Sequence, residues 1–337
     1  MINTSLIQKS VIIRIYLVIL INIVYDINRE SQMENISGHT IVFIINSLRK
    51  MPVDLTSLLS EINQNCIVKN CTAWFTNYAG HASELALVAC NEKTDLIVAV
   101  GGDGTFNEVL NGILKSGNTN TSLALIPNGT GNDFCRGQGI IYSREKFIDA
   151  LKNKNYINYD AGMITQGTNQ RYFLNIADLG FGGHTAKILN AQRKMGLKGS
   201  ISYSVAILRS FGSFRKPEVQ IIVDGKPLYN GKLMMLTVCN GDTFGSGLII
   251  HPGAIPHDGL LNITLLGEVT LWDYVSNIFK LKKGLKIDHP AISYHTAQKI
   301  SVTITKGNAS IESDGEMVGD GDAEISILPG SVKVLKY

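Results

Sequence analysis

Short apolar runs and longer amphipathic stretches alternate through the first half of the chain. Continuous apolar runs occupy residues 41–45, 96–100 and 123–126, and such runs are typical of parallel strands that are covered on both faces. Residues 105–116 instead repeat apolar positions at helical spacing. This alternation predicts the α/β fold class, with a doubly wound parallel-sheet domain over residues 37–160.

The second half of the chain shows a different pattern, in which short strand-like segments dominate. Two helical patterns, at residues 183–194 and 270–283, interrupt it, and Asp-Gly pairs at residues 224–225 and 258–259 mark turns. The pattern predicts a β-rich, sandwich-like domain over residues 161–337. The strand-like segments cover residues 219–223, 232–239, 260–266, 300–305 and 325–328.

The N-terminus carries an apolar stretch that lies outside both domains. Residues 11–25 are mostly apolar but contain Arg14 and Asn22, whereas a membrane-spanning helix needs about 20 predominantly apolar residues. No small-residue cleavage site follows this stretch, which argues against a signal peptide. Residues 1–36 are therefore expected to be an extension that either associates with a membrane or precedes a true start at Met33. The second interpretation is favoured.

Composition and charge exclude several classes of protein. A net charge of +3 in 337 residues is too small for a dedicated nucleic-acid binder, so no nucleic acid partner is expected. The five cysteines include no CxxC pair, which predicts a reduced, cytoplasmic location and no zinc site. The apolar fraction of 45% is typical of a globular protein.

The stretch LIVAVGGDGTFNEVLNG, residues 96–112, joins a predicted buried strand to a predicted helix through two glycines, an aspartate and a third glycine. Glycines there place bare backbone N–H groups at a helix N-terminus, where these groups can hold phosphate. A tight turn without a ligand is the alternative. The chain contains neither the P-loop signature nor the GxGxxG dinucleotide fingerprint, so both of those nucleotide-binding classes are excluded.

Two further segments carry candidate chemistry. NGTGNDF, residues 128–134, follows the predicted strand at 123–126, and two such loops on neighbouring strands predict a binding cleft at the carboxyl ends of the strands. Near the C-terminus, ASIESDGEMVGD, residues 309–320, places Asp314 and Glu316 on either side of a glycine. An Asp-Gly pair is most often a hairpin turn, so this segment alone does not predict catalysis.

These motifs resemble those of the soluble diacylglycerol kinase and sphingosine kinase family, including its bacterial lipid kinase members. GGDGTFNEVLNG is similar to the nucleotide loop of that family, PNGTGNDF to its second loop, and the late DGE to the element that carries its catalytic aspartate. FGSGLIIHPGAIPHDGLLNITLL, residues 244–266, resembles the segment that leads into a structural metal site. The resemblance covers residue 39 to the C-terminus. It implies a diacylglycerol kinase-type catalytic domain over residues 37–160, with ATP and Mg²⁺ as cofactors.

The resemblance also implies roles for individual residues. Asp314 would be the catalytic base that takes the proton from the attacking hydroxyl. After the first strand, INSLRKMP lacks the turn that many family members show, which leaves the adenine side of the pocket unassigned. The residues implied for ATP binding are Thr76, Gly101, Gly102, Asp103, Gly104, Thr105, Phe106, Asn107, Thr130 and Glu316.

Two metal sites are implied by the same resemblance. Carboxylates that match acidic family positions would organise the catalytic Mg²⁺, and these are Asp103, Asp133 and Asp160. A second metal would bind the Asp258 carboxylate together with the backbone oxygens of Ile255 and Leu260. Magnesium prefers carboxylates and water, which agrees with a cleft that offers acids without a histidine or cysteine cluster.

The function implied is an ATP-dependent lipid kinase that phosphorylates a hydroxyl of diacylglycerol or a related lipid. An NAD kinase, which shares the GGDGT loop, and a non-catalytic nucleotide-binding module are the alternatives. The expected partners are a lipid substrate and a membrane surface, contacted transiently through the basic segments at residues 192–198 and 281–286. The protein is expected to be cytoplasmic and peripheral at the inner face of the membrane. A homodimer is left open.

Overall fold

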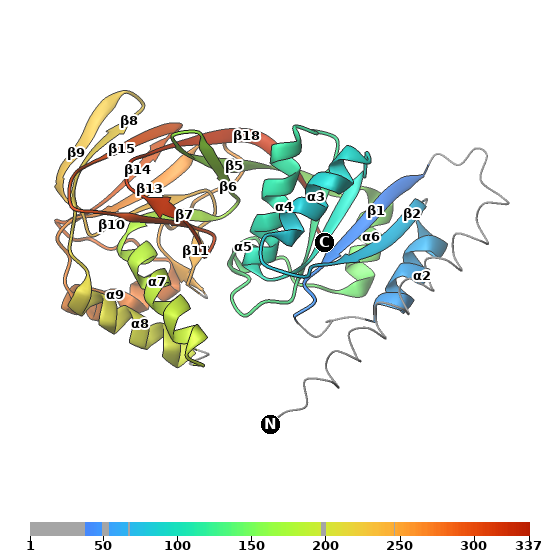
Figure 1. Cartoon of the computed structure of the whole chain (residues 1–337), viewed down its shortest axis with the longest axis horizontal. Coiled ribbons are helices and arrows are strands. Elements are labelled where there is room, and N and C mark those ends of the chain that lie inside the picture. Colours follow the sequence, from blue (N-terminus) through green and yellow to red (C-terminus); the bar gives the residue numbers. More distant parts are fainter. Residues whose placement is uncertain (1–37, 49–53, 67, 197–199, 246) are drawn as a thin grey trace.

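The computed structural model describes residues 38–48, 54–66, 68–196, 200–245 and 247–337 (Figure 1). The predicted N-terminal extension over residues 1–36, with the Met33 start, lies outside the described residues. Within the described part of the chain, no helix is both long enough and apolar enough to cross a membrane.

The first domain is a parallel sheet with helices on both faces, as predicted. Its strands, in spatial order, are β2 (Val68–Phe75), β1 (His39–Ile45), β3 (Leu96–Gly101) and β4 (Ser122–Pro127). One face is covered by α3 (His81–Asn91) and α4 (Asp103–Ser116), the other by α2 (Leu55–Asn65) and α6 (Arg144–Asn153). The apolar runs form β1, β3 and β4 because side chains on either face of these strands meet a helix.

The order of these strands creates a switch point between β1 and β3. The chain leaves β1 toward α2 on one face of the sheet and leaves β3 toward α4 on the other. Neighbouring connections that diverge in this way open a crevice at the carboxyl ends of the strands, where open α/β sheets bind ligands. Asn46 follows β1 and Gly102 follows β3, so these residues lie on the two sides of the crevice.

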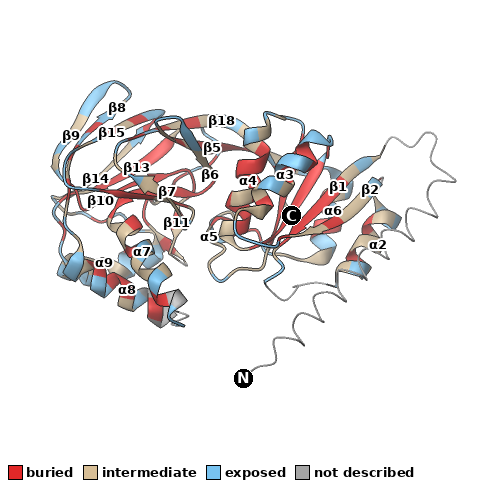
Figure 2. Ribbon diagram, in the orientation of Figure 1, coloured by how far each residue is buried: buried red, intermediate tan, exposed pale blue. Residues whose placement is uncertain are grey.

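The second domain is a sandwich of two largely antiparallel sheets, as predicted. The strands of one sheet, in spatial order, are β14 (Ile292–Ala297), β13 (Leu261–Leu266), β10 (Met235–Cys239), β7 (Ile176–Gly180), β16 (Ser310–Ser313) and β17 (Glu316–Asp320). The facing layer consists of β6 (Asn169–Phe173), β5 (Tyr156–Gln166), β18 (Ala323–Leu335), β15 (Lys299–Lys306), β8 (Glu218–Val223) and β9 (Lys226–Lys232). Phe173, Leu236 and Ile300 are fully buried between the two layers, and Figure 2 shows the buried strands of both domains.

One prediction for the second domain is wrong. In the described residues three helices, not two, interrupt the strands: α7 (Phe181–Lys194), α8 (Ser200–Ser213) and α9 (Leu271–Lys283). The sequence of α8, SISYSVAILRSFGS, is rich in serine, β-branched and aromatic residues, which have only moderate helix propensity. Packing against α7 and α9 therefore stabilises α8 more than its own sequence does.

The last strand connects the two domains. β18 pairs with β15 in the second domain and, beyond an irregularity between Leu328 and Val332, pairs with β4 in the first, where Val334 lies opposite Leu123. β5 runs antiparallel to β18 along both halves. The sheet of the first domain therefore continues into the second (Figure 1). The predicted boundary near residue 160 falls inside β5 and stays a prediction.

Candidate active site

The two glycine-containing loops lie against each other at the carboxyl ends of β3 and β4. The Asn128 N–H donates to the Gly101 carbonyl at 2.6 Å, and a Cβ on Gly102 would lie 2.9 Å from Gly129 Cα. Within the second loop, the Gly129 N–H donates to Asn132 Oδ1 at 2.9 Å. The close approach of the two loops therefore requires glycine at position 102.

Asp103 fastens the first loop to the second. Its Oδ2 accepts from the N–H of Asn132 and its Oδ1 accepts from the N–H of Asp133, both at 2.7 Å. A Cβ on Gly131 would lie 2.9 Å from Asp103 Oδ2 and 3.4 Å from Asp133 Oδ2, so the two carboxylates lie beside the same glycine. Burial raises the pKa of Asp103, and the backbone donors oppose that shift.

The start of α4 offers backbone donors to a ligand. Gly102 is the N-cap in an extended conformation, and no described side chain caps the helix there. The Phe106 N–H donates to the Gly102 carbonyl at 3.0 Å, whereas the N–H groups earlier in a first helical turn lack intrahelical partners. Those groups, together with the helix dipole, suit an anion. The Thr105 and Phe106 side chains are buried, so only the backbone of these residues is available to a ligand.

Thr76 closes the crevice on the side of β1 and β2. Its Oγ1 accepts from the Ser47 N–H at 3.4 Å, and its carbonyl accepts from the Ser47 hydroxyl at 2.5 Å. Asn46 Nδ2 donates to Thr105 Oγ1 at 3.2 Å, which connects the two sides of the switch point. Asn46 and Ser47 belong to the segment that departs from the family pattern, so the resemblance did not assign them.

Asp314 lies in the two-residue turn between β16 and β17, and both turn residues have positive φ, 48° and 87°. Its Oδ2 accepts from Asn107 Nδ2 and from the Leu174 N–H, both at 3.0 Å. Its Oδ1 accepts from the N–H groups of Asn175 at 3.2 Å and Ile176 at 3.0 Å. The Asp-Gly pair is therefore a hairpin turn whose carboxylate is held by four donors. Burial raises the pKa of Asp314, and these donors oppose the shift.

Asn107 and Asn111 lie on one stripe of α4 and connect this helix to the second domain. The Nδ2 of each donates to the Tyr172 carbonyl, at 3.0 and 2.9 Å, and Asn111 Oδ1 accepts from the Tyr172 N–H at 3.0 Å. Asn107 Oδ1 also accepts from the Arg171 guanidinium on β6. Asn107 is 1% exposed. Asn107, which the resemblance assigned to ATP, therefore connects α4 to β6 and to Asp314.

Three more acids lie near the hairpin. Glu316 Oε1 lies 2.9 Å from the position that a Cβ on Gly104 would take, so Glu316 covers the first turn of α4. Glu312 and Asp178 lie opposite each other on β16 and β7, and Asp178 Oδ1 accepts from the Gly183 N–H at 2.8 Å. Burial raises the pKa of Asp178 to about 7. Burial and the neighbouring charge of Asp178 raise the pKa of Glu312.

Asp160 holds loops of the second domain to β5. Its Oδ1 accepts from the Gly330 N–H and its Oδ2 from the Gly259 N–H, both at 2.7 Å. Its own N–H donates to the Pro256 carbonyl at 2.8 Å. Asp160 is 3% exposed, so a buried carboxylate with two backbone donors ties together the segment before β13 and the irregularity in β18.

The second predicted metal site lies in this same segment. Asp258 is exposed and its Oδ1 accepts from the Leu260 N–H at 3.0 Å, while Ile255 is also exposed. Among the described residues, no three acidic, histidine or cysteine side chains form a preformed metal site. Mg²⁺ often binds only one or two protein carboxylates and takes its remaining ligands from phosphates and water. Asp103 and Asp133 fit that donor set, and both metal assignments stay predictions.

Several polar residues of the site were missed from the sequence. Arg136 donates to the Gly131 carbonyl at 3.1 Å, and Arg171 contacts Asn107, so a cation lies beside the second loop and another beside α4. Glu108 accepts from the N–H of Gly80, the N-cap of α3, at 2.8 Å and from the N–H of Ala82 in its first turn at 3.1 Å. One signal in the sequence could have indicated a polar face on α4. The two asparagines of FNEVLNG, Asn107 and Asn111, are four residues apart and therefore lie on one face of a helix. Thr130, which was assigned to ATP, is exposed in the second loop.

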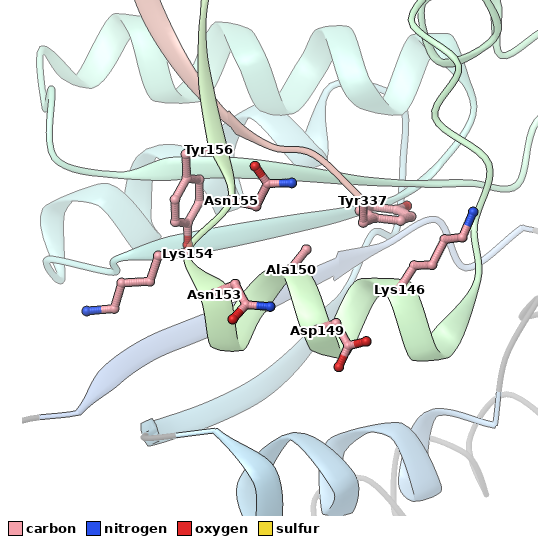
Figure 3. A pocket seen from close by; sticks show the side chains of 8 residues that line it. All are labelled: Lys146, Asp149, Ala150, Asn153, Lys154, Asn155, Tyr156 and Tyr337. Atoms are coloured by element: carbon pink, nitrogen blue, oxygen red, sulfur yellow. The ribbon is translucent and has the colours of Figure 1, made fainter.

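A separate surface hollow is shown in Figure 3. It is lined by side chains of α6, among them Lys146 and Asp149, together with Tyr156 and Tyr337. Its described lining includes none of the predicted site residues, and it lies on the face of the sheet that α2 and α6 cover. The candidate site is therefore the crevice at the glycine loops and the hairpin of Asp314.

Comparison with known proteins identifies relatives of both domains. Residues 41–164 match the diacylglycerol kinase catalytic domain, and residues 176–336 match the YegS C-terminal NAD kinase beta sandwich-like domain. The diacylglycerol kinase of Bacillus subtilis is 33% identical over 257 residues, which cover 76% of this chain and 80% of that protein. A putative lipid kinase of Staphylococcus haemolyticus is 27% identical over 295 residues, which cover 87% of this chain and 89% of that protein.

The fold has solved counterparts. The crystal structure of a putative diacylglycerol kinase from Bacillus anthracis superposes with a TM-score of 0.69 at 20% sequence identity, and the match covers 90% of this chain and 99% of that one. A diacylglycerol kinase structure from the same organism gives a TM-score of 0.64 at 20% identity and covers 90% of this chain and 98% of the other. At this level of identity the likeness concerns the arrangement of both domains.

Proposed function

Because the chain belongs to the diacylglycerol kinase family, we propose that it is an ATP-dependent lipid kinase that transfers the γ-phosphate of ATP to a hydroxyl of diacylglycerol or a related lipid. The observation that carries this proposal is the hydrogen bond from Asn107 to Asp314 across 207 residues of sequence. It brings a carboxylate beside the helix whose N-terminus suits phosphate. Phosphoryl transfer needs these two features side by side.

The residues of the crevice divide the work of the proposed reaction. The N–H groups of residues 101–105 would bind phosphate oxygens, and Thr76 would face the nucleotide from β2. Asp103 and Asp133 would hold Mg²⁺, which when bound neutralises charge on the phosphates. Asp314 would accept the proton of the lipid hydroxyl. Its pKa is raised by burial, which brings it closer to the neutral range where a general base works best.

The four donors around Asp314 make one demand on this mechanism. A carboxylate has about four acceptor sites, and four protein donors occupy them in this structure. The substrate hydroxyl must therefore replace one donor before its proton can be taken. Asn107 is the side-chain donor among the four, and the other three are backbone N–H groups of residues 174–176.

A lipid acceptor would place the reaction at a membrane surface. We propose that the protein acts as a peripheral enzyme at the cytoplasmic face of the membrane, in the synthesis or turnover of phospholipids. The Asp258 region, with the backbone oxygens of Ile255 and Leu260, would bind a second metal that stabilises the segment before β13. Asp160, which accepts a hydrogen bond from the Gly259 N–H of this segment, would help to fix the position of that site.

Two alternatives predict other products. An NAD kinase would phosphorylate NAD, and a non-catalytic module would bind ATP without turnover. The curated relatives, named diacylglycerol kinase and putative lipid kinase, favour the lipid kinase. The intact Asp314 disfavours the non-catalytic module.

The experiment is a labelled-ATP assay of the purified full chain with Mg²⁺. The acceptors offered are diacylglycerol, a sphingoid base, ceramide, phosphatidylglycerol and NAD, each in detergent micelles or buffer. We expect label in a lipid product and none in NAD, and we expect Asp314→Asn to remove that label. Label in NAD alone would establish the NAD kinase, whereas ATP binding without any labelled product would establish the binding module.

A further inference from the structure

Helix α9 exposes an apolar stripe on the outside of the second domain. Trp272 and Phe279 are 78% and 74% exposed, and Val275 between them is 47% exposed. Their spacing of three and four residues places them on one face. The opposite face of the helix packs inward through Tyr274, Ile278 and Leu281. The exposed stripe is thus a second apolar face that the core does not use, and contiguous exposed aromatic side chains mark interaction surfaces.

Lysines flank this stripe at one end. Lys280, Lys282 and Lys283 occupy the last turn of α9, and all three are exposed. Lys286, three residues after the end of the helix, is exposed as well. The one acid in the helix, Asp273, is engaged in the capping box with Thr270, and its Oδ1 lies 3.5 Å from His289 Nε2. The exposed charge of the helix is therefore positive.

Helix α8 packs beside α9 and also exposes apolar and basic side chains. Phe211 of α8 contacts Tyr274 of α9, with ring centroids 5.9 Å apart, and the two helices lie side by side at the lower edge of the second domain (Figure 1). Leu208 on α8 is 55% exposed, and the neighbouring Arg209 is exposed. Figure 2 shows exposed residues along the outer sides of both helices.

We propose that the outer face of α9, formed by Trp272, Val275 and Phe279 with the lysines of its last turn, docks on the surface of an anionic phospholipid bilayer. An interfacial helix combines these features: aromatic side chains reach the acyl boundary while lysines bind anionic headgroups. A second copy of the chain is a poorer occupant, because its α9 would bring the same three lysines against these, and the one acid of that helix, Asp273, already caps its N-terminus. The choice of a lipid surface rests on the proposed lipid kinase function, although docking needs no turnover.

Vesicle sedimentation of the full chain tests this proposal without ATP and without an acceptor lipid, so its failure is distinct from failure of the kinase assignment. We expect binding to vesicles of phosphatidylglycerol mixed with phosphatidylcholine, and weaker binding to phosphatidylcholine alone. Trp272→Ser with Phe279→Ser should weaken binding by about tenfold or more, since two large apolar side chains no longer enter the interface. Lys280→Gln, Lys282→Gln and Lys283→Gln together should weaken vesicle binding by about fivefold per lysine and remove the preference for the anionic lipid.

Ile141→Ser provides the matched control. Ile141 is 77% exposed in the segment between α5 (Asp133–Gly137) and α6 of the first domain. The substitution therefore removes an equally exposed apolar side chain from another surface. Vesicle binding by this variant should equal that of the parent. Unchanged melting temperatures would show that all variants fold. Equal vesicle binding by the parent and the Trp272, Phe279 variant would overturn the proposal. The proposal would also be overturned if the parent were a dimer and the Trp272, Phe279 variant a monomer, with the same vesicle binding by both.

Discussion

The two domains contribute to the candidate site in different ways. The first domain contributes backbone, since its glycine loops lie close together and the N–H groups at the start of α4 face the crevice. The second domain contributes side chains, above all the carboxylate of Asp314, which is held by three backbone donors and Asn107. Backbone donors persist whichever side chains surround them, whereas one side chain can be removed by one substitution. Turnover should therefore be more sensitive to single substitutions in the second domain than to those in the first.

The largest expected effect is that of Asp314→Asn. An amide cannot take the hydroxyl proton, so kcat should fall by about 10² to 10⁴. The substitution also places an NH₂ group against backbone N–H donors, which should lower the melting temperature. The rate of lipid product formation and the ATP affinity from calorimetry should both be measured. A lower rate with unchanged ATP affinity would indicate loss of the base and not loss of the fold.

Glu316→Gln is the matched control for this prediction, because Glu316 lies in the same hairpin but is exposed and covers Gly104. Its loss of turnover should be much smaller. If both variants lost turnover to a similar extent with ATP binding intact, Asp314 would not be the catalytic base. The two domains would then not differ in their sensitivity to substitution.

The next largest effect is expected for Asn107→Ala. Hydrogen bonds to a charged group contribute about 1.5–3 kcal/mol, so turnover should fall by about tenfold to a hundredfold if the bond positions Asp314 for the reaction. Asn111→Ala is the control, since Asn111 also donates to the Tyr172 carbonyl but its recorded bonds do not include Asp314. Similar melting temperatures with unequal kcat values would assign the difference to Asp314. Equal kcat values would reduce Asn107 to a tether between the domains.

Substitutions at two glycines probe the first-domain side. A Cβ at position 102 would meet the Gly129 backbone, whereas a Cβ at position 104 would meet the movable end of Glu316, each at 2.9 Å. Gly102→Ala should therefore destabilise the protein by about 1–3 kcal/mol, as overpacking does, and Gly104→Ala should cost less. Gly104→Val should weaken ATP binding while the fold persists, because the side chain then lies at the helix N-terminus. Thermal melting and calorimetry check both statements, and an unchanged ATP affinity in Gly104→Val would leave the loop without a phosphate role.

Much of the fold could be predicted from sequence because local patterns carry it. The strands β1, β3 and β4 and the helix α4 are confirmed, since continuous apolar runs and helical periodicity are local signals. Helix α8 was missed because its stability comes from its neighbours. The pairing of β18 with β4 joins residues that are distant in sequence, and no local pattern reports such a pairing.

The residues of the candidate site could be named from the sequence, and their roles stay predictions, whereas the contacts among them could not be predicted. The motifs identified Asp103, Asp133 and Asp314, but the four donors around Asp314 come from two different segments, 174–176 and α4. Their convergence depends on the register of β7 against β16 and on the position of α4. From the sequence, the glycines indicated either a phosphate ligand or a tight turn, whereas the structure adds the close approach of the two loops.

The smallest effect concerns the acids behind the hairpin and is a dependence on pH. Burial raises the pKa of Asp178 from 3.8 to about 7, so folding favours the protonated form. The stability that this group contributes is then fully present below pH 3.8 and is lost as the pH rises through about 7, by at most about 1.4 kcal/mol per pH unit. Asp178→Asn cannot ionise but keeps an acceptor for the Gly183 N–H. The melting temperature of the parent should therefore fall more between pH 5.5 and pH 8, as rough limits of the titration, than that of the variant. Parallel falls would mean that Asp178 is not the group whose ionisation lowers the stability, and that its partner Glu312 or another carboxyl group carries the dependence on pH.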